Sequence, residues 1–365
     1  MLHAPPALES LKLPADRQLR VAMVAPPWFE VPPVGYGGTE AVVGNLVNGL
    51  VAAGHHVTLF AAGANGTSAQ VFVQIFETPP TEYLGDPMPE MAAAVEVERH
   101  LQGLEFDVIH DHSLAGPLLA PHRLAPTVVT VHGLVTGWYG SYYERLGTEV
   151  SPVAISADQR ARNDAIQWAG MVHNAIDVSS YTADATKDDY VLWLGRFCED
   201  KAPHLAIDAA RKRRRKIVLA GKCNEAPERA FFEREIAPRL GPDVEYVGEA
   251  DAELKRELLA RAAVLAFPIQ WDEPFGMVMA EALASGTPIV AFPRGSVPEV
   301  VQYGKTGFVA RDLDGFASAL DAARGLDPKA CRADAVARFD LPVMARGYGG
   351  VYAQAVRVGT TAASL

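Results

Sequence analysis

The feature that most constrains this chain is a strand–loop–helix–strand unit between residues 262 and 292. An apolar run, Ala262 to Pro268, predicts a buried strand. The stretch Asp272-Glu273-Pro274-Phe275-Gly276-Met277-Val278-Met279-Ala280-Glu281 then begins with a helix breaker and continues with good helix formers. Ser285-Gly286-Thr287-Pro288 predicts the helix end, and Ile289 to Phe292 predicts the second strand. In such a unit, ligands bind at the carboxyl ends of the strands.

Two carboxylates lie on either side of the expected helix start. Glu273 precedes it in the loop, and Glu281 is more than one turn into the helix. The amides of Gly276, Met277 and Val278 have no intrahelical partner there, so they favour an anion such as a phosphate. A carboxylate only accepts hydrogen bonds, and vicinal hydroxyls are its natural donors. The pattern therefore predicts a ligand with hydroxyls on both sides of a phosphate, the shape of a nucleotide sugar, whereas two solvated helix-end glutamates are the alternative.

The first half of the chain predicts another βαβ unit, with glycines at its strand-to-helix turn. Arg20 to Ala25 is expected to be a strand, and Gly35-Tyr36-Gly37-Gly38-Thr39-Glu40 precedes a helix with one apolar face. Such a turn suits a phosphate or a close sugar approach, and a simple turn is the alternative for Gly37 and Gly38. The dinucleotide-binding pattern Gly-x-Gly-x-x-Gly lacks its third glycine here, which disfavours an NAD-dependent dehydrogenase.

Three histidines stand at expected strand ends, His110, His112 and His132. We expect His132 to face the cleft, and His110 and His112 to be mainly structural, with His112 as a candidate for the cleft lining. No third ligand at a suitable spacing supports a metal site. Residues 137–143 are expected to form an aromatic loop, in which Trp138 and Tyr139 are candidates for an acceptor-binding wall. Packing of this loop on its own domain is the alternative.

Two groups of cations stand out in the second half. Arg196 and Lys201 follow an expected strand at residues 190–194, and both are hydrogen-bond donors suited to a diphosphate. A pair of surface charges is the alternative. The run from Arg211 to Lys216 is explained by a solvated helix end that offsets the helix dipole, with weak contact to an acidic membrane surface as the alternative. Asp312-Leu313-Asp314 looks like a metal-binding pair but follows the last expected strand, so helix capping is expected.

Composition excludes several classes of protein. A chain of 365 residues predicts two domains at about 150 residues each. A net charge of -11 disfavours binding to nucleic acid, which requires a basic face. No apolar run approaches the roughly 20 residues of a membrane span, and the N-terminal residues lack the apolar core of a secretory signal. Three widely spaced cysteines without a Cys-x-x-Cys pattern disfavour disulfides and zinc, so a cytoplasmic protein is expected.

Several motifs together resemble family 4 of the retaining glycosyltransferases, from about residue 20 to residue 356. They are Gly35-Tyr36-Gly37-Gly38, Thr130-Val131-His132-Gly133, Gly195-Arg196 with Lys201, Glu273-Pro274-Phe275-Gly276 to Glu281, and Gly295-Ser296-Val297-Pro298-Glu299. The Glu-x7-Glu pair is the most specific of them. The resemblance implies the GT-B fold, an α/β architecture of two Rossmann-like, doubly wound domains facing across a cleft. Ala175 and Ala202 depart from the family pattern, in which glycine is usual at both positions.

The resemblance implies a division of the chain. We expect a loose tail at residues 1–18, an acceptor-side domain at 19–180 and a donor-side domain at 181–345. Residues 346–365 are expected to form a helix that crosses back to the N-terminal domain, followed by a short tail.

The resemblance also implies roles for the matching positions. Glu273 would bind hydroxyls of the donor sugar, and Glu281 those of the ribose. Arg196 and Lys201 would hold the diphosphate, and His132 would lie close to the donor sugar. The other residues expected at the donor are Gly37, Gly38, Tyr246, Val247, Gly276, Met277 and Val278, of which Tyr246 and Val247 would meet the base.

The implied reaction moves a hexose from a nucleotide-diphosphate sugar to an acceptor hydroxyl, with retention at the anomeric carbon. A UDP-sugar is the favoured donor and a GDP-sugar the next, with no cofactor and no metal. The acceptor, which could be a saccharide, a small molecule or a lipid-linked group, is left open. Alternatives are a nucleotide-sugar epimerase on the same fold, an NAD-dependent dehydrogenase and a non-catalytic nucleotide-sugar-binding protein.

Overall fold

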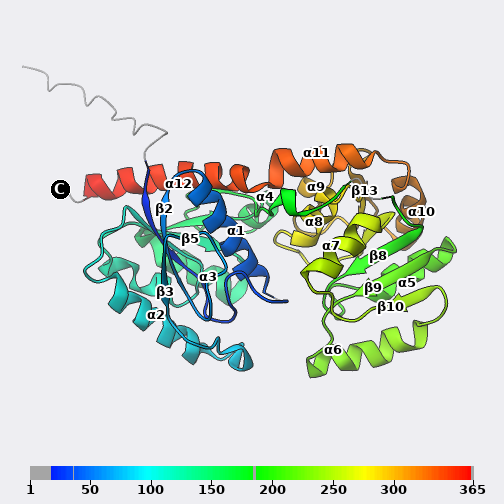
Figure 1. Cartoon of the computed structure of the whole chain (residues 1–365), viewed down its shortest axis with the longest axis horizontal. Helices are drawn as coiled ribbons and strands as arrows, with labels where there is room; N and C mark the ends of the chain where they lie inside the picture. Colours follow the sequence, from blue (N-terminus) through cyan, green and yellow to red (C-terminus); the bar gives the residue numbers. More distant parts are fainter. Residues whose placement is uncertain (1–17, 36, 184–185, 363–365) are drawn as a thin grey trace, which may run out of the picture.

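A computed structural model describes residues 18–35, 37–183 and 186–362 and shows two α/β domains side by side (Figure 1). The N-terminal domain is built on a 7-stranded sheet and the C-terminal domain on a 6-stranded sheet, both parallel throughout. The predicted fold class is thus confirmed. Residues 1–17 of the expected tail, residues 363–365 of the C-terminal tail, and Tyr36 of the glycine loop lie outside the described residues.

The N-terminal sheet has the strand order β3-β2-β1-β4-β5-β6-β7. Its central strands are nearly continuous apolar runs because helices cover both faces of the sheet. The order reverses between β1 and β4, and the crevice at such a reversal is where ligands bind in open α/β sheets. The strands are β1 (Arg20–Val24), β2 (His56–Ala61), β3 (Val71–Gln74), β4 (Val108–Asp111), β5 (Thr127–Val131), β6 (Val150–Ala154) and β7 (Gly170–Met171). The helices are α1 (Gly38–Ala52), α2 (Pro87–Leu101), α3 (Gly137–Leu146) and α4 (Ala157–Ala161).

The C-terminal sheet repeats this arrangement with the strand order β10-β9-β8-β11-β12-β13. Its reversal lies between β8 and β11, so the loops that follow these two strands meet at one crevice. The strands are β8 (Tyr190–Leu194), β9 (Lys216–Ala220), β10 (Val244–Tyr246), β11 (Val264–Phe267), β12 (Ile289–Ala291) and β13 (Gly307–Val309). The helices are α5 (Pro203–Lys212), α6 (Ala226–Phe231), α7 (Ala252–Arg261), α8 (Met277–Ala284), α9 (Val297–Val300), α10 (Leu313–Ala323) and α11 (Pro328–Phe339).

The last helix, α12 (Leu341–Ala362), returns to the N-terminal domain and packs on α1, β4 and β5 (Figure 1). It begins directly after α11, earlier than the residue 346 at which the final segment was expected. Two of its aromatic side chains, Tyr348 and Tyr352, are fully buried in the N-terminal domain. The division at residues 18, 180 and 345 stays a prediction, since sheets and contacts do not fix domain limits to the residue.

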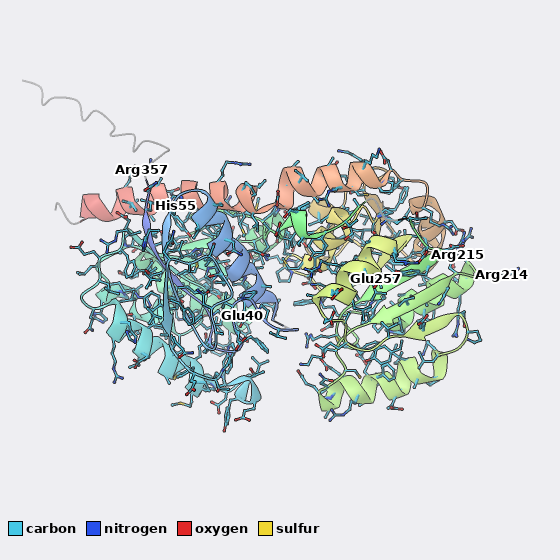
Figure 2. The ribbon with its side chains drawn as sticks, viewed as in Figure 1. Glu40, His55, Arg214, Arg215, Glu257 and Arg357 are labelled. Atoms are coloured by element: carbon cyan, nitrogen blue, oxygen red, sulfur yellow. The ribbon has the colours of Figure 1, made fainter. Side chains whose placement is uncertain are left out.

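The cationic run lies at the outer end of the C-terminal domain, where Figure 2 shows Arg214 and Arg215 far from Glu40 of α1. Most of its side chains are paired with acidic residues of other segments. Arg211 is 2.8 Å from Asp243, and Lys212 and Arg213 pair with Asp314 and Asp321. These ion pairs weaken the prediction of contact with an acidic membrane surface, because the cations already have partners.

Other features of the described residues bear on the expectations from composition. Cys198, Cys223 and Cys331 are free thiols. No helix within residues 18–35, 37–183 and 186–362 is long and apolar enough to cross a bilayer. Within the same residues, no group of three or more His, Cys, Asp or Glu side chains is arranged to hold a metal ion. Asp312 accepts a hydrogen bond from the amide of Gly315 as the N-cap of α10, which confirms the capping role expected there.

Candidate active site

A continuous groove lies between the two domains. It consists of two adjoining cavities of about 390 and about 380 Å³. The first extends between α1 and α7, and the second extends between His132 and the loop that carries Glu273. The residues that line both cavities, and so join them, are Gly38, Leu194, Gly195, Arg196 and Met277.

The first wall of the groove contains Glu273, in the loop between β11 and α8. Its side chain is almost buried, and its Oε2 accepts a hydrogen bond from Trp271 Nε1 at 3.0 Å. Lys201 forms an ion pair with the same oxygen. Both contacts end on Oε2, so the carboxylate is oriented while Oε1 is left for another donor.

The Glu273 loop is held by the segment that follows β12. Gly295 has φ 54°, and a Cβ atom there would lie 2.2 Å from the carbonyl oxygen of Glu273. Ser296 donates from its backbone amide to that carbonyl at 2.9 Å and from its hydroxyl to the carbonyl of Phe275 at 2.7 Å. The motif that begins at Gly295 therefore acts by fixing the backbone on which Glu273 stands.

Helix α8 begins where the sequence predicted. Gly276 is its N-cap, with φ 76°, and a Cβ atom there would lie 2.9 Å from Met279 Cε. The first intrahelical amide bond is donated by Met279 to the carbonyl of Gly276 at 2.9 Å. The amides of Met277 and Val278 thus belong to the open helix start, where an anion is favoured, and both residues line the groove.

Glu281 lies on the same helix and repeats the arrangement seen at Glu273. Its Oε1 accepts hydrogen bonds from Lys255 Nζ at 2.6 Å and from Tyr181 Oη at 3.2 Å. Burial, with the neighbouring carboxylate, raises the pKa of Tyr181 well above its usual value, so the phenol stays a donor. Each glutamate is therefore oriented by one lysine and one aromatic donor.

Arg196 follows β8 and lines both cavities, between the two glutamates. Its Nη1 lies 3.9 Å from Glu228 Oε1 of α6. Lys201 Nζ lies 5.3 Å from the centre of the Trp271 ring. The expected diphosphate cations are therefore both at the groove.

The opposite wall is formed by the N-terminal domain and carries little charge. Gly38 opens α1 and lines both cavities, and a Cβ atom there would meet nothing within 4 Å. Gly37, its N-cap, lines the first cavity. A backbone without side chains at this point lets a ligand approach the helix start closely.

His132, at the end of β5, lines the second cavity on the same side as Gly38. Burial lowers its pKa to about 4, so the imidazole is neutral near pH 7. His112 lies beneath it, with His112 Nδ1 2.8 Å from His132 Nε2. The N-terminal wall thus faces the charged wall with a neutral hydrogen-bonding group.

Comparison with known proteins agrees with this geometry. Residues 36–194 match the family model described as Glycosyltransferase Family 4, and residues 188–323 match the model described as Glycosyl transferases group 1. Together the two models span more than half of the chain. The chain belongs to glycosyltransferase family 4.

This glycosyltransferase is similar along nearly its whole length to characterised relatives. It is 28% identical over 380 residues to a phosphatidyl-myo-inositol mannosyltransferase of Mycolicibacterium smegmatis, a match that covers 94% of each chain. It is 27% identical over 401 residues to a glycogen synthase of Mycobacterium tuberculosis, covering 93% of this chain and 95% of that one. The predicted family is thereby confirmed.

Solved structures confirm the GT-B fold. AviGT4, a glycosyltransferase involved in avilamycin A biosynthesis, superposes with a TM-score of 0.71 at 28% identity, over 93% of this chain and 98% of that one. A sucrose-phosphate synthase from Thermosynechococcus elongatus superposes with a TM-score of 0.74 at 20% identity, over 94% and 100% of the two chains. The second likeness concerns the fold alone.

Some expected site residues of the glycosyltransferase lie away from the groove. Tyr246 packs against Phe197 and Phe232, and neither it nor Val247 lines the groove cavities. The groove instead receives residues 249–252, which follow the next turn. That Tyr246 and Val247 meet the base therefore stays a prediction, and residues 249–252 are the part of this segment that lines the groove.

The acceptor-side expectations also need correction. The aromatic segment is not a loop but helix α3, whose exposed side chains include Trp138 at 87% and Tyr139 at 52%. Neither residue lines the groove cavities, although Trp138 and Tyr139 lie only a few residues beyond His132. His112 is buried under His132 and does not line the groove itself.

The sequence interpretation missed several residues of the groove. Lys255 and Tyr181, the partners of Glu281, come from α7 and from the segment between the domains. Asn174 lines the second cavity, and its buried Oδ1 has no hydrogen-bond partner in the part of the chain that the structure describes. A signal for Lys255 existed, because it follows the third strand-to-helix turn of the C-terminal sheet. Tyr181 and Asn174 carry no such local signal.

Proposed function

We propose that this glycosyltransferase moves a hexose from a nucleotide-diphosphate sugar to an acceptor hydroxyl, with retention and without a metal. The observation that carries the proposal is the placement of Glu273 and Glu281. Each is oriented by a lysine and an aromatic donor, and the open start of α8 lies between them. Two fixed hydroxyl-binding groups on either side of an anion site match a sugar, a diphosphate and a ribose in that order.

The donor is then held mainly by the C-terminal wall. Arg196, Lys201 and the amides of Met277 and Val278 surround the diphosphate. Glu273 accepts hydrogen bonds from the hexose with the oxygen that Trp271 and Lys201 do not occupy. Glu281 accepts hydrogen bonds from the ribose. The base extends toward residues 249–252, at the far end of the first cavity.

The chemistry follows from this placement. The acceptor oxygen forms a bond to the anomeric carbon, and the bond from that carbon to the diphosphate oxygen breaks. The diphosphate leaves with the electron pair, and the acceptor proton passes to the departing phosphate oxygen on the same face of the sugar. Because the leaving group is a stable dianion held by Arg196 and Lys201, stabilising its developing charge supplies most of the catalysis.

The neutral N-terminal wall completes the site. Gly38 allows the sugar and phosphate to approach the start of α1, and His132 can form a hydrogen bond with the sugar without adding charge. The exposed side chains of Trp138 and Tyr139 stay candidates for the acceptor, since aromatic faces stack on sugars. An acceptor bound there would reach the groove past His132.

The donor base is proposed as uracil first and guanine second. Among solved structures, Anabaena Alr3699/HepE is found in complex with UDP-glucose and superposes with a TM-score of 0.69 at 16% identity. That likeness concerns the fold alone. The choice between bases in this chain rests on experiment.

The decisive test is a thermal-shift panel of UDP-, GDP-, ADP- and TDP-sugars, followed by turnover with the best donor. We expect one nucleotide class to raise the melting temperature and glycosyl transfer to depend on an added acceptor. NMR of the product should show the anomeric configuration of the donor, and EDTA should leave the rate unchanged. Conversion of the sugar nucleotide without an acceptor would instead favour an epimerase, an inverted product would refute retention, and a large loss with EDTA would refute metal independence.

A further inference from the structure

Beneath the cleft-lining His132 lies a second imidazole that has contacts at both of its ring nitrogens. His112 Nδ1 is 2.8 Å from His132 Nε2, and His112 Nε2 is 3.1 Å from Met23 Sδ. His112 is almost completely buried, whereas His132 reaches the groove. The two contacts together restrict where the protons of both rings can be.

The sulfur of Met23 decides the assignment. A thioether sulfur accepts hydrogen bonds but has no proton to donate, so the close contact requires an N–H on His112 Nε2. Burial lowers the pKa of His112 well below its usual value, so the ring is neutral and carries only that one proton. His112 Nδ1 is then an acceptor, and the proton between the two rings belongs to His132 Nε2. The opposite assignment would set two lone pairs against each other at the sulfur.

The orientation of His112 is itself supported from below. The ring centres of His110 and His112 are 4.2 Å apart. His110 is hydrogen-bonded at both nitrogens, to Tyr352 Oη at 2.7 Å and to Thr130 Oγ1 at 2.7 Å. Because Tyr352 belongs to α12, the returning C-terminal helix supports the stack of imidazole rings formed by His110, His112 and His132. Rings held in this way have little freedom to rotate or to exchange roles.

We propose that His112 is a positioning residue that fixes the tautomer of His132, so that His132 Nδ1 presents a lone pair to the groove and accepts a hydrogen bond from a sugar hydroxyl. The ligand class rests on the proposed function, whereas the tautomer does not. His132 then acts as an acceptor on the N-terminal wall, opposite the Glu273 acceptor on the C-terminal wall. A hexose hydroxyl that donates to His132 Nδ1 is held from both domains at once.

The tautomer can be measured directly in the full-length protein labelled with 15N-histidine. Long-range 1H–15N spectra distinguish a protonated from an unprotonated ring nitrogen, and a His132→Asn variant assigns the signals. We expect His132 to carry its proton on Nε2 in the free enzyme. Observation of the proton on Nδ1 would overturn the proposal, whatever the substrate proves to be.

Two substitutions at His112 separate positioning from packing. In His112→Asn the side-chain carbonyl can take the place of Nδ1 and accept from His132, whereas His112→Leu fills similar space without an acceptor. We expect His112→Leu to lower kcat by about 10- to 100-fold with little change in KM, and His112→Asn to restore most of the rate. Equal losses in both variants, with an unchanged His132 tautomer, would contradict the proposal.

Met23→Leu tests the same assignment without touching either histidine. The exchange conserves volume and so disturbs packing little. It removes the acceptor of His112 Nε2–H, so we expect His132 to show a mixture of both tautomers and kcat to fall by a few-fold. If His132 in Met23→Leu still carried its proton only on Nε2, the sulfur would not set the tautomer, and the assignment made from the Met23 contact would be overturned. If no nucleotide sugar is turned over at all, the proposed function fails while the spectra still decide the tautomer.

Discussion

The two walls of the groove differ in how they carry charge. On the C-terminal wall, Glu273 and Glu281 form ion pairs with Lys201 and Lys255. On the N-terminal wall, the neutral imidazole of His132 reaches the groove beside the bare backbone of Gly38, and uncharged polar residues such as Thr39 and Asn45 also line it. Under the proposed function, one domain would bind the charged donor, while the other would approach the reacting sugar without adding an ion that would have to be desolvated.

The largest effect should come from breaking the charged wall at Lys201. Lys201→Ala removes a cation from the leaving diphosphate and leaves the nearly buried Glu273 unpaired. We expect kcat/KM to fall by about 10²- to 10³-fold, measured by initial rates with the best donor. Lys212→Ala, which removes a surface ion pair with Asp314, is the control and should leave the rate unchanged. A loss of less than a few-fold at Lys201 would refute the division between the walls.

A buried carboxyl in the N-terminal domain allows the comparison of the two walls to be tested by the pH dependence of stability. Glu40, in the first turn of α1, is buried, and this burial raises its pKa to about 7. The folded state therefore holds a proton that the unfolded state has already lost. Its stabilising effect is complete below about pH 4.5, the ordinary pKa of a glutamate, and is lost as pH rises through the folded-state pKa of about 7.

The expected size of this effect is up to about 3 kcal/mol in the free energy of unfolding. Glu40→Gln keeps the site neutral, so it should remove that pH dependence. The stability of the variant relative to the wild type should therefore be higher at pH 8 than at pH 5. Urea unfolding at the two pH values measures the difference. Glu105→Gln, at a side chain that is 92% exposed, is the control. The same pH profile for wild type and Glu40→Gln would show that Glu40 is charged and that the N-terminal side is not neutral.

The second glutamate of the charged wall should affect binding more than chemistry. Glu281→Gln keeps the shape of the side chain but removes its charge. A ribose hydroxyl then donates its hydrogen bond to a neutral amide oxygen in place of a carboxylate. We expect the dissociation constant of the free nucleotide, measured by calorimetry, to rise by about 10-fold, close to 1.4 kcal/mol. Glu257→Gln, on the outer side of α7, should leave it unchanged. Unchanged affinity in Glu281→Gln would refute its assignment to the ribose.

The smallest effect concerns the backbone beneath Lys201. Ala202 is the N-cap of α5 and has φ 49°, a left-handed conformation that costs a non-glycine residue roughly 1–2 kcal/mol. Ala202→Gly relieves this strain but also loosens the unfolded chain, so we expect a net gain below about 1 kcal/mol in unfolding free energy. Arg214, with φ 54°, offers a matched control, since Arg214→Gly should behave alike at a site remote from the groove. Destabilisation in both variants would show that neither position is strained.

Much of the fold was predictable because it depends on local patterns. Continuous apolar runs identified the buried strands, and glycines at strand ends marked the turns where α1 and α8 begin. Gly276 was expected at the start of α8, and it is the N-cap there. Helix α3 was missed, because its glycine and aromatic residues have low helix propensity and packing decides its conformation.

The residues of the site were predictable to a similar degree, but the predictions that failed did so for a different reason than those for the fold. Residues at the ends of central strands, such as Arg196 and Glu273, reach the groove because the sheet order brings these ends together. Tyr246 and Val247 were expected at the base from the family resemblance, and neither lines the groove cavities, whereas residues 249–252 do. His112 was expected to be mainly structural and was a candidate for the lining, and it is buried against His132.

The sequence by itself determined the strand–loop–helix units, the glutamates around the start of α8 and the cations that follow β8, because each is encoded within a few neighbouring residues. Only the tertiary structure decided that Tyr181 and Lys255 orient Glu281, that Gly295 holds the Glu273 loop, and that a stack reaching α12 supports His132. These contacts join residues far apart in the chain. Their geometry depends on how two sheets and a returning helix pack, and no local pattern specifies that packing.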